Sequence, residues 1–283
     1  MARGRARVRA RAARAGDAIP AALVTGASSG IGAACAEHLR DLGWTVFASV
    51  RGQGQAPAGT TELVFDVTDP VGVGHAAARV EELDGLVANA GIAIAAPLEF
   101  LPPEELQRQL DVNVVGQLRV VQAFLPALRR RSGRIVLMGS IAGRSSLPFL
   151  GAYAMSKFGL EAMADALRVE LAPFGMHVAI VEPGTIATAI WTKPQRTVES
   201  LPPEAAERYG ARIQKFRDHA AQRSSTAAVP AVEVAKVVEH ALTASPPKTR
   251  YLVGPDAKRR ARLQKLPDRM RDRLLAKLLF GGS

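Results

Sequence analysis

The chain has 283 residues, of which 48% are hydrophobic and 22% are charged, so it can form one large α/β domain or two small ones around an ample core. Its single cysteine, Cys35, excludes an internal disulfide and favours a reducing cytoplasm, and no apolar run reaches the roughly 18 residues that span a bilayer. The five histidines are scattered without the spacing of a metal site, so the sequence predicts no metal centre.

The net charge of +11 is concentrated at the two ends of the chain. Residues 1–14 carry six arginines and no acidic residue, and residues 257–283 carry nine basic and two acidic residues, which leaves about −2 for residues 15–256. The central part therefore lacks the basic face of a nucleic-acid-binding fold, and we expect no nucleic-acid partner. Residues 1–17 are predicted to be a disordered basic tail, with an Arg-rich targeting segment as the alternative.

Short apolar segments alternate with helical segments from residue 18 onward. Strands are expected at residues 21–26, 44–50, 61–67, 84–91, 133–140, 177–184 and 250–254. Helices are expected at residues 30–42, in a run ending at 82, and at 103–130, 152–172 and near 204–221. This alternation is typical of a parallel sheet covered on both faces. We therefore expect the α/β class, with one doubly wound, mostly seven-stranded parallel sheet (a Rossmann fold) in a single domain over residues 18–256.

Two segments depart from the alternation. Residues 185–226 contain three prolines and follow the carboxyl end of a strand, where such folds place substrate-covering segments. Residues 257–283 are a basic amphipathic stretch that Pro267 is expected to divide into two short helices. This extension either packs against the domain or a second subunit, or makes peripheral contact with an anionic membrane surface.

The sequence TGASSGIG, residues 25–32, joins the first expected strand to the first expected helix. Gly26, Gly30 and Gly32 permit a tight turn and let the backbone approach a pyrophosphate, whose charge the helix N-terminus favours. A glycine-rich turn without a ligand is the alternative. The position of the motif on the first strand favours nucleotide binding.

The end of the second expected strand indicates which dinucleotide binds. An acidic residue there would bind the 2′-hydroxyl of NAD, but Val50 and Arg51 occupy this place. An arginine can pair with a 2′-phosphate, so we expect NADP, with NAD less favoured. Arg51 as a solvated loop charge is the alternative.

Tyr153 and Lys157 lie four residues apart in an expected helix, which stacks them on one face. This pair alone does not decide a function, but together with the other motifs it resembles the short-chain dehydrogenase/reductase family over about residues 20–255. The resemblance is greatest to NADP-using steroid and retinol dehydrogenase-type branches, through VFASVR at residues 46–51. The departures are Ala88, where many members have asparagine, and Ser29, where many NADP users have a basic residue.

The resemblance implies two sets of site residues. The implied catalytic residues are Asn113, Ser140, Tyr153 and Lys157. The implied cofactor-binding residues are Gly26, Ser28, Ser29, Gly30, Ile31, Gly32, Arg51, Asp66, Val67, Asn89, Ala90, Gly91, Tyr153, Lys157, Pro183, Gly184 and Thr188.

The chemistry of these residues suits hydride exchange with a carbonyl. Tyr153 would give or take the proton on the oxygen, and the ammonium of Lys157 is expected to lower the pKa of the phenol. Ser140 would orient the substrate oxygen. The resemblance further implies that Lys157 holds the nicotinamide ribose and that Asn113 holds a water in a proton relay. A helix-kink or capping role is the alternative for Asn113, and turn chemistry for Ser140.

The expected function is that of an NADP(H)-dependent oxidoreductase, EC 1.1.1.-, that interconverts an apolar secondary alcohol and its ketone. Residues 92–95, 145–151 and 185–191 are mostly apolar and lack an Arg or Lys cluster suited to a carboxylate or phosphate, which favours a steroid-, retinoid- or lipid-like substrate. A non-catalytic dinucleotide-sensing or scaffold protein on the same fold is the alternative. The single cysteine favours a cytoplasmic protein, and the resemblance suggests a homodimer or homotetramer that associates through residues 103–130 and 152–172.

Overall fold

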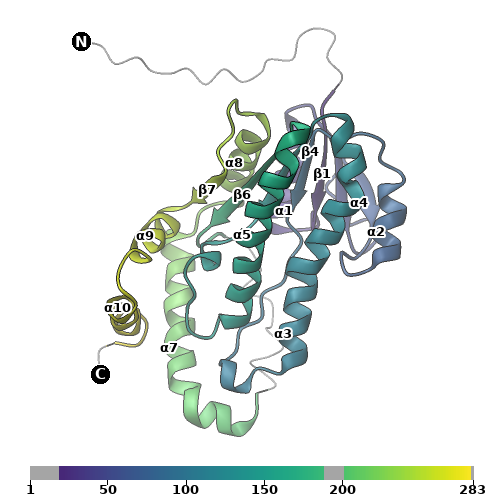
Figure 1. Cartoon of the computed structure of the whole chain (residues 1–283). Coiled ribbons are helices and arrows are strands. Elements are labelled where there is room, and N and C mark those ends of the chain that lie inside the picture. Colours follow the sequence, from purple (N-terminus) through teal and green to yellow (C-terminus); the bar gives the residue numbers. More distant parts are fainter. Residues whose placement is uncertain (1–18, 188–200, 282–283) are drawn as a thin grey trace, which may run out of the picture.

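Seven strands form one sheet at the centre of a computed structural model, which describes residues 19–187 and 201–281 (Figure 1). The strands are β1 (Ala21–Thr25), β2 (Thr45–Val50), β3 (Thr61–Val64), β4 (Gly85–Ala88), β5 (Arg134–Met138), β6 (His177–Pro183) and β7 (Arg250–Val253). Their order is β3-β2-β1-β4-β5-β6-β7, and every neighbouring pair is parallel. The expected doubly wound parallel sheet is confirmed, while the basic tail and Thr188 lie outside the described residues.

Helices cover both faces of the sheet, and each face has its own apolar core. The helices of the sheet layers are α1 (Gly30–Asp41), α2 (Pro70–Ala77), α3 (Pro103–Leu110), α4 (Gly116–Arg130), α5 (Gly151–Leu171) and α8 (Ala231–Thr243). Phe124 of α4 and Leu160 of α5 pack on one face, and Leu39 of α1 and Val238 of α8 pack on the other. Burial on both faces explains why the strands read as continuous apolar runs.

The expected helix over residues 103–130 contains an irregularity at its middle. Helix α3 ends at Leu110, a π-helical turn η2 (Asp111–Val115) follows, and α4 begins at Gly116. The π turn has one extra residue per turn, so it changes the direction in which Asn113 points. The predicted helix over residues 103–130 is present, but the sequence did not indicate this π turn, which is also where a catalytic residue is expected.

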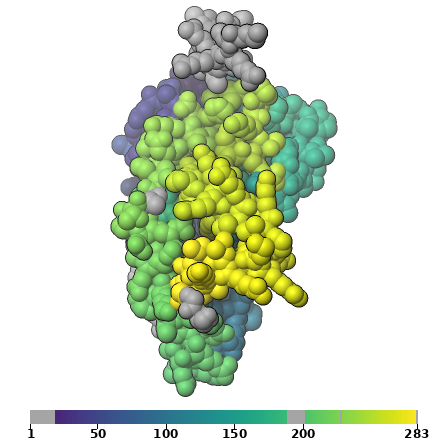
Figure 2. Space-filling model, turned by 90° about the vertical axis from the view of Figure 1, so that its left-hand side faces the viewer, coloured from purple at the N-terminus to yellow at the C-terminus, as the bar shows by residue number. Residues whose placement is uncertain are grey.

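Three helices extend from the carboxyl edge of the sheet. They are α7 (Pro203–Ala227), α9 (Pro255–Leu263) and α10 (Asp268–Phe280), and Pro267 separates the last two as expected. The Lys215 ammonium donates to the Phe280 carbonyl oxygen at 2.8 Å, so α10 packs against α7. Figure 2 shows the two C-terminal helices, in yellow, beside the green α7. The described residues contain no helix long and apolar enough to cross a bilayer.

Candidate active site

The loop between β1 and α1 has the geometry of a cradle for a dinucleotide. Gly26 and Gly30 have φ angles of 67° and 61°, which residues other than glycine rarely adopt. A Cβ on Gly32 would lie 2.2 Å from the Gly26 carbonyl oxygen, so only glycine allows this approach of helix to loop. The first turn of α1 has no acidic residue to oppose an anion at its N-terminus. Gly26, Gly30 and Gly32 therefore fit a bound pyrophosphate, together with Ser28, Ser29 and Ile31 of the same loop.

The Asn89–Gly91 segment is fastened to this cradle. The Asn89 amide nitrogen Nδ2 donates to the Thr25 carbonyl oxygen at 2.8 Å. The backbone N–H groups of Asn89 and Ala90 both donate to the Thr25 hydroxyl, at 2.9 and 3.0 Å. A Cβ on Gly26 would meet the Ala90 Cα at 2.9 Å, so the two loops lie in contact. The structure thus brings together predicted residues that are more than 60 positions apart.

Arg51 and Asp66 lie together beyond the ends of β2 and β3. The Asp66 carboxylate accepts from the Thr68 N–H at 2.8 Å and from its hydroxyl at 2.7 Å. Burial raises the pKa of the Asp66 carboxyl. The two Thr68 hydrogen bonds and the charge of Arg51 together lower it by more, so the pKa lies below its usual value. Arg51 is exposed, and Val67 is buried with its carbonyl oxygen bound to Arg119.

Ser140, Tyr153 and Lys157 meet at the carboxyl end of β5. Ser140 follows that strand and caps the short helix η3 (Ile141–Gly143), where its hydroxyl accepts from the Ala142 N–H at 3.1 Å. Tyr153 and Lys157 lie on α5 with only 7% and 5% of their surface exposed. The Tyr153 and Ser140 side chains are hydrogen-bonded, and the Lys157 nitrogen lies 5.6 Å from the centre of the Tyr153 ring. These three predicted catalytic residues therefore form one buried polar cluster.

The electrostatics of the cluster differ from the sequence-based expectation. Burial raises the pKa of Tyr153, against opposing contributions from the Ser140 hydrogen bond and the positive charge of Arg260. Burial also lowers the pKa of Lys157 to about 8. The expected lowering of the phenol pKa is thus wrong, because the cost of desolvating a phenolate outweighs the neighbouring charges.

Asn113 lies behind this cluster, in the π turn η2. Its amide oxygen accepts from the Ile92 N–H at 2.9 Å, and its nitrogen donates to the Ile92 carbonyl oxygen and the Ser156 hydroxyl, both at 3.0 Å. Ser156 in turn donates to the Tyr153 carbonyl oxygen at 2.7 Å. Asn113 therefore joins the segment after Gly91 to the helix that carries Tyr153. Ser156 was not identified from the sequence, where only its position between Tyr153 and Lys157 was a signal.

The Pro183–Gly184 motif ends β6 against the start of α9. A Cβ on Gly184 would lie 2.0 Å from Oδ1 of Asp256, so glycine is required for this contact. The other carboxylate oxygen of Asp256 accepts from the Thr185 N–H at 2.8 Å and its hydroxyl at 2.9 Å, and from Arg223 at 2.7 Å. Asp256 and Arg223 were missed by the sequence analysis, because no local motif marks residues that meet only through folding.

Comparisons with known proteins agree with this geometry. Residues 20–199 match the family described as short chain dehydrogenase. Human 17-beta-hydroxysteroid dehydrogenase type 1 is 38% identical, over 81% of this chain and 76% of the relative. The NADPH-dependent 3-dehydrocapnine reductase of Ornithobacterium rhinotracheale is 35% identical, over 90% of this chain and 96% of the relative. A short chain dehydrogenase from Burkholderia cenocepacia, solved in complex with NADP, has a TM-score of 0.72 and 27% identity. The match covers 93% of this chain and 98% of that structure.

Both structural features agree with these matches: the glycine cradle, and the buried cluster of Ser140, Tyr153 and Lys157. The chain belongs to the short chain dehydrogenase family, and it is an alcohol oxidoreductase with a nicotinamide dinucleotide as its cofactor.

Proposed function

We propose that this oxidoreductase uses NADP(H) to interconvert an apolar secondary alcohol and its ketone, with a steroid-, retinoid- or lipid-like body. The observation that carries the proposal is the hydrogen bond between the side chains of Ser140 and Tyr153, which are buried beside Lys157. Arg51 at the end of β2, where NAD enzymes have an acid, supports NADP.

The proposed roles are those that the family resemblance implies, and the positions of the side chains support them. When bound, the nicotinamide supplies or accepts the hydride. The Tyr153 hydroxyl gives its proton to the substrate oxygen in reduction, and its raised pKa keeps that proton available at neutral pH. Ser140 donates to the same oxygen and orients it, and Lys157 as an ammonium holds the cofactor ribose and favours the phenolate. Asn113 positions the start of α5 through Ser156.

An apolar substrate body is supported by aromatic rings around the loop that precedes α5. Phe149, in the loop before α5, makes edge-to-face contacts with Tyr209 and Phe216 of α7 and with Phe280 of α10, at centroid separations of 5.7 to 6.2 Å. Steroid and retinol dehydrogenases are among the similar proteins. The expected residues Ile190 and Trp191 lie outside the described part of the chain.

The test is replacement of Tyr153 by phenylalanine. The control is Tyr251→Phe, because Tyr251 lies on β7 and hydrogen-bonds His240 and the Lys248 N–H, away from the cluster. NADPH oxidation with a panel of apolar ketones should fall roughly a hundredfold to ten-thousandfold in Tyr153→Phe, while NADPH still binds. A wild-type protein that binds NADPH and reduces no ketone of the panel would overturn the proposal and favour a dinucleotide sensor.

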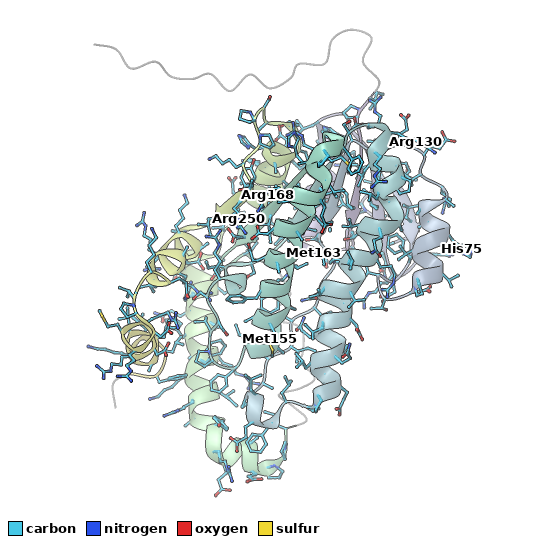
Figure 3. All side chains as sticks on the ribbon, viewed as in Figure 1. His75, Arg130, Met155, Met163, Arg168 and Arg250 are labelled. Atoms are coloured by element: carbon cyan, nitrogen blue, oxygen red, sulfur yellow. The ribbon has the colours of Figure 1, made fainter. Side chains whose placement is uncertain are left out.

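We also propose that the chain is a homodimer or homotetramer in which α4 and α5 face a second copy. Met155, Phe158 and Val169 of α5 are exposed by 42%, 47% and 72%, although they are apolar. Figure 3 shows Met155 and Met163 along α5. Light scattering of wild type and Phe158→Asp tests this, because a buried carboxylate at the interface should yield monomers.

A further inference from the structure

Arg260 of α9 brings a cation to the catalytic cluster from the C-terminal extension. One of its terminal nitrogens donates to the carbonyl oxygen of Ser145, which is buried and lies just after the η3 turn that Ser140 caps. The Arg260 Nε atom is also buried and has no hydrogen-bond partner among the described residues. A buried guanidinium N–H without an acceptor is costly, so this atom is available for an acceptor that arrives with a ligand.

The charges around Arg260 do not cancel within the described residues. Its pKa is lowered to about 10, first by burial and then by the charge of Arg223, so it remains a cation at neutral pH. The nearby carboxylate is Asp256, one helical turn away, and its Oδ2 is already bound by Arg223 and Thr185. The Asp256 Oδ1 atom lies against the Gly184 backbone and, like the Arg260 Nε atom, has no hydrogen-bond partner among the described residues. Two guanidinium groups thus share one carboxylate, which leaves an excess positive charge that acts on Tyr153.

The same loop that binds Arg260 also carries the aromatic cluster. Ser145 begins this loop and Phe149, with its unusual φ of 66°, lies near its end. The loop therefore has a cation at one end and rings of α7 and α10 around the other. A substrate lying along it would meet both a charge and an apolar surface.

We propose that Arg260 binds a carboxylate of the substrate, so that the enzyme acts on a hydroxy acid or oxo acid with an apolar chain. This deepens the proposed function and rests on it. A carboxylate would accept a charge-assisted hydrogen bond from the Nε atom and supply the missing negative charge. From the sequence we expected an uncharged substrate, because Arg260 belongs to the C-terminal extension and not to the segments expected to face the substrate.

The proposal is tested with matched acids and esters. NADPH oxidation is followed with oxodecanoates that carry the ketone at successive positions, each beside its methyl ester. For the wild type we expect kcat/KM for the best acid to exceed that of its ester roughly ten- to hundredfold. Arg260→Met should bring this ratio to about one, whereas Arg259→Met, an exposed neighbour on α9, should retain it.

A binding measurement keeps the result independent of turnover. Calorimetry of decanoate and decanamide with the NADP-loaded protein should give tighter binding of decanoate to the wild type and equal binding to Arg260→Met. Equal binding of the two to the wild type overturns the inference even if the variant does not fold. So does an acid-to-ester ratio that Arg260→Met leaves unchanged, or a variant that weakens only NADPH binding. Absence of turnover with every ketone, acid and ester alike, instead refutes the proposed function.

Discussion

The Lys157 ammonium donates a hydrogen bond to the Met138 carbonyl oxygen, 2.8 Å away at the carboxyl end of β5. This bond fixes the cation beside the Tyr153 ring. A backbone carbonyl thus accepts from the buried ammonium. Because burial still disfavours the charged form, the pKa of Lys157 is lowered to about 8.

The first prediction concerns the pH dependence of cofactor use. The ammonium is present below the pKa of Lys157 and is lost above it, so kcat/KM for NADPH should decline as the pH rises through about 8. This ratio reports the titrating groups of the free enzyme. Lys157→Met should bind NADPH at least about tenfold more weakly and lose this decline. Lys236→Met, which breaks an exposed ion pair with Glu233, should retain it; a wild-type profile that is flat from pH 7 to 9 contradicts the assignment.

The second prediction concerns the glycine cradle. In Gly32→Ala the new Cβ would lie 2.2 Å from the Gly26 carbonyl oxygen and 2.6 Å from the Asn89 amide nitrogen. The helix and the loop must then move apart, so we expect a melting temperature lower by several degrees and NADPH binding weakened by roughly tenfold or more. Gly74→Ala is the control, since a Cβ there meets no atom within 4 Å in α2 and should be neutral or slightly stabilising. Fluorescence titration with NADPH and thermal melting measure both effects, and unchanged binding in Gly32→Ala would show that the cradle is not the cofactor site.

The third prediction concerns cofactor choice. Arg51→Ala removes the exposed cation beyond β2, so kcat/KM for NADPH should fall roughly tenfold while that for NADH changes little. The neighbouring Asp66 carboxylate, whose pKa Arg51 lowers, would then repel a 2′-phosphate more strongly. Arg79→Ala, another exposed arginine, serves as the control. Equal loss with both cofactors would assign Arg51 a structural role instead.

The sheet and the cradle could be predicted because their signals are local. Strand, turn and helix succeed one another within a few residues at positions 21–41, and the same alternation recurs along the chain. Strand ends were less accurate: β3 ends at Val64 and β4 at Ala88, because the hydrogen-bonded ladders stop before the apolar runs do.

The parts of the site that could not be predicted depend on contacts between distant residues. The π turn at Asn113 exists together with its hydrogen bonds to Ile92, which lies 21 positions earlier. Arg260 reaches Ser145 across 115 positions. The periodicity of one segment does not indicate contacts with distant segments. The pattern of a basic helix by itself predicts only a solvent-exposed surface.

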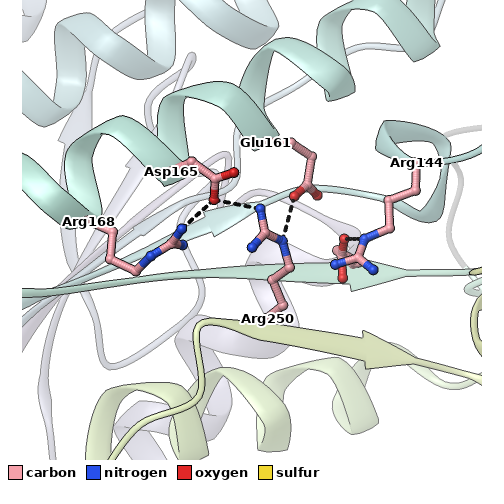
Figure 4. A network of polar contacts seen from close by, with 6 residues as sticks. Arg144, Glu161, Asp165, Arg168 and Arg250 are labelled. Carbon is pink, nitrogen blue, oxygen red and sulfur yellow. Dashed lines mark hydrogen bonds and ion pairs between the residues drawn. The ribbon is translucent and has the colours of Figure 1, made fainter.

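The fourth prediction concerns Glu182, which lies fully buried on β6 directly before Pro183. Figure 4 shows the surrounding network, in which Arg144 binds Glu182 and Arg250 binds Glu161 and Asp165. Burial and the adjacent Glu161 raise the pKa of Glu182, Arg144 opposes both, and the net result is a pKa of about 7. The folded protein therefore binds a proton here more readily than the unfolded chain does.

It follows that the contribution of Glu182 to stability is fully present below the pKa of an unfolded glutamate, about 4.3, and is lost as the pH rises through about 7. Glu182→Gln has no charge to bury. Its free energy of unfolding relative to that of the wild type should therefore rise by roughly 1–3 kcal/mol from pH 5 to pH 8. Urea unfolding of both proteins at the two pH values measures this difference, and subtraction cancels the other titrating groups. Glu170→Gln, an exposed change on α5, should show no such gain. A difference between Glu182→Gln and wild type that stays constant with pH would mean that Glu182 is ionised throughout, held by Arg144.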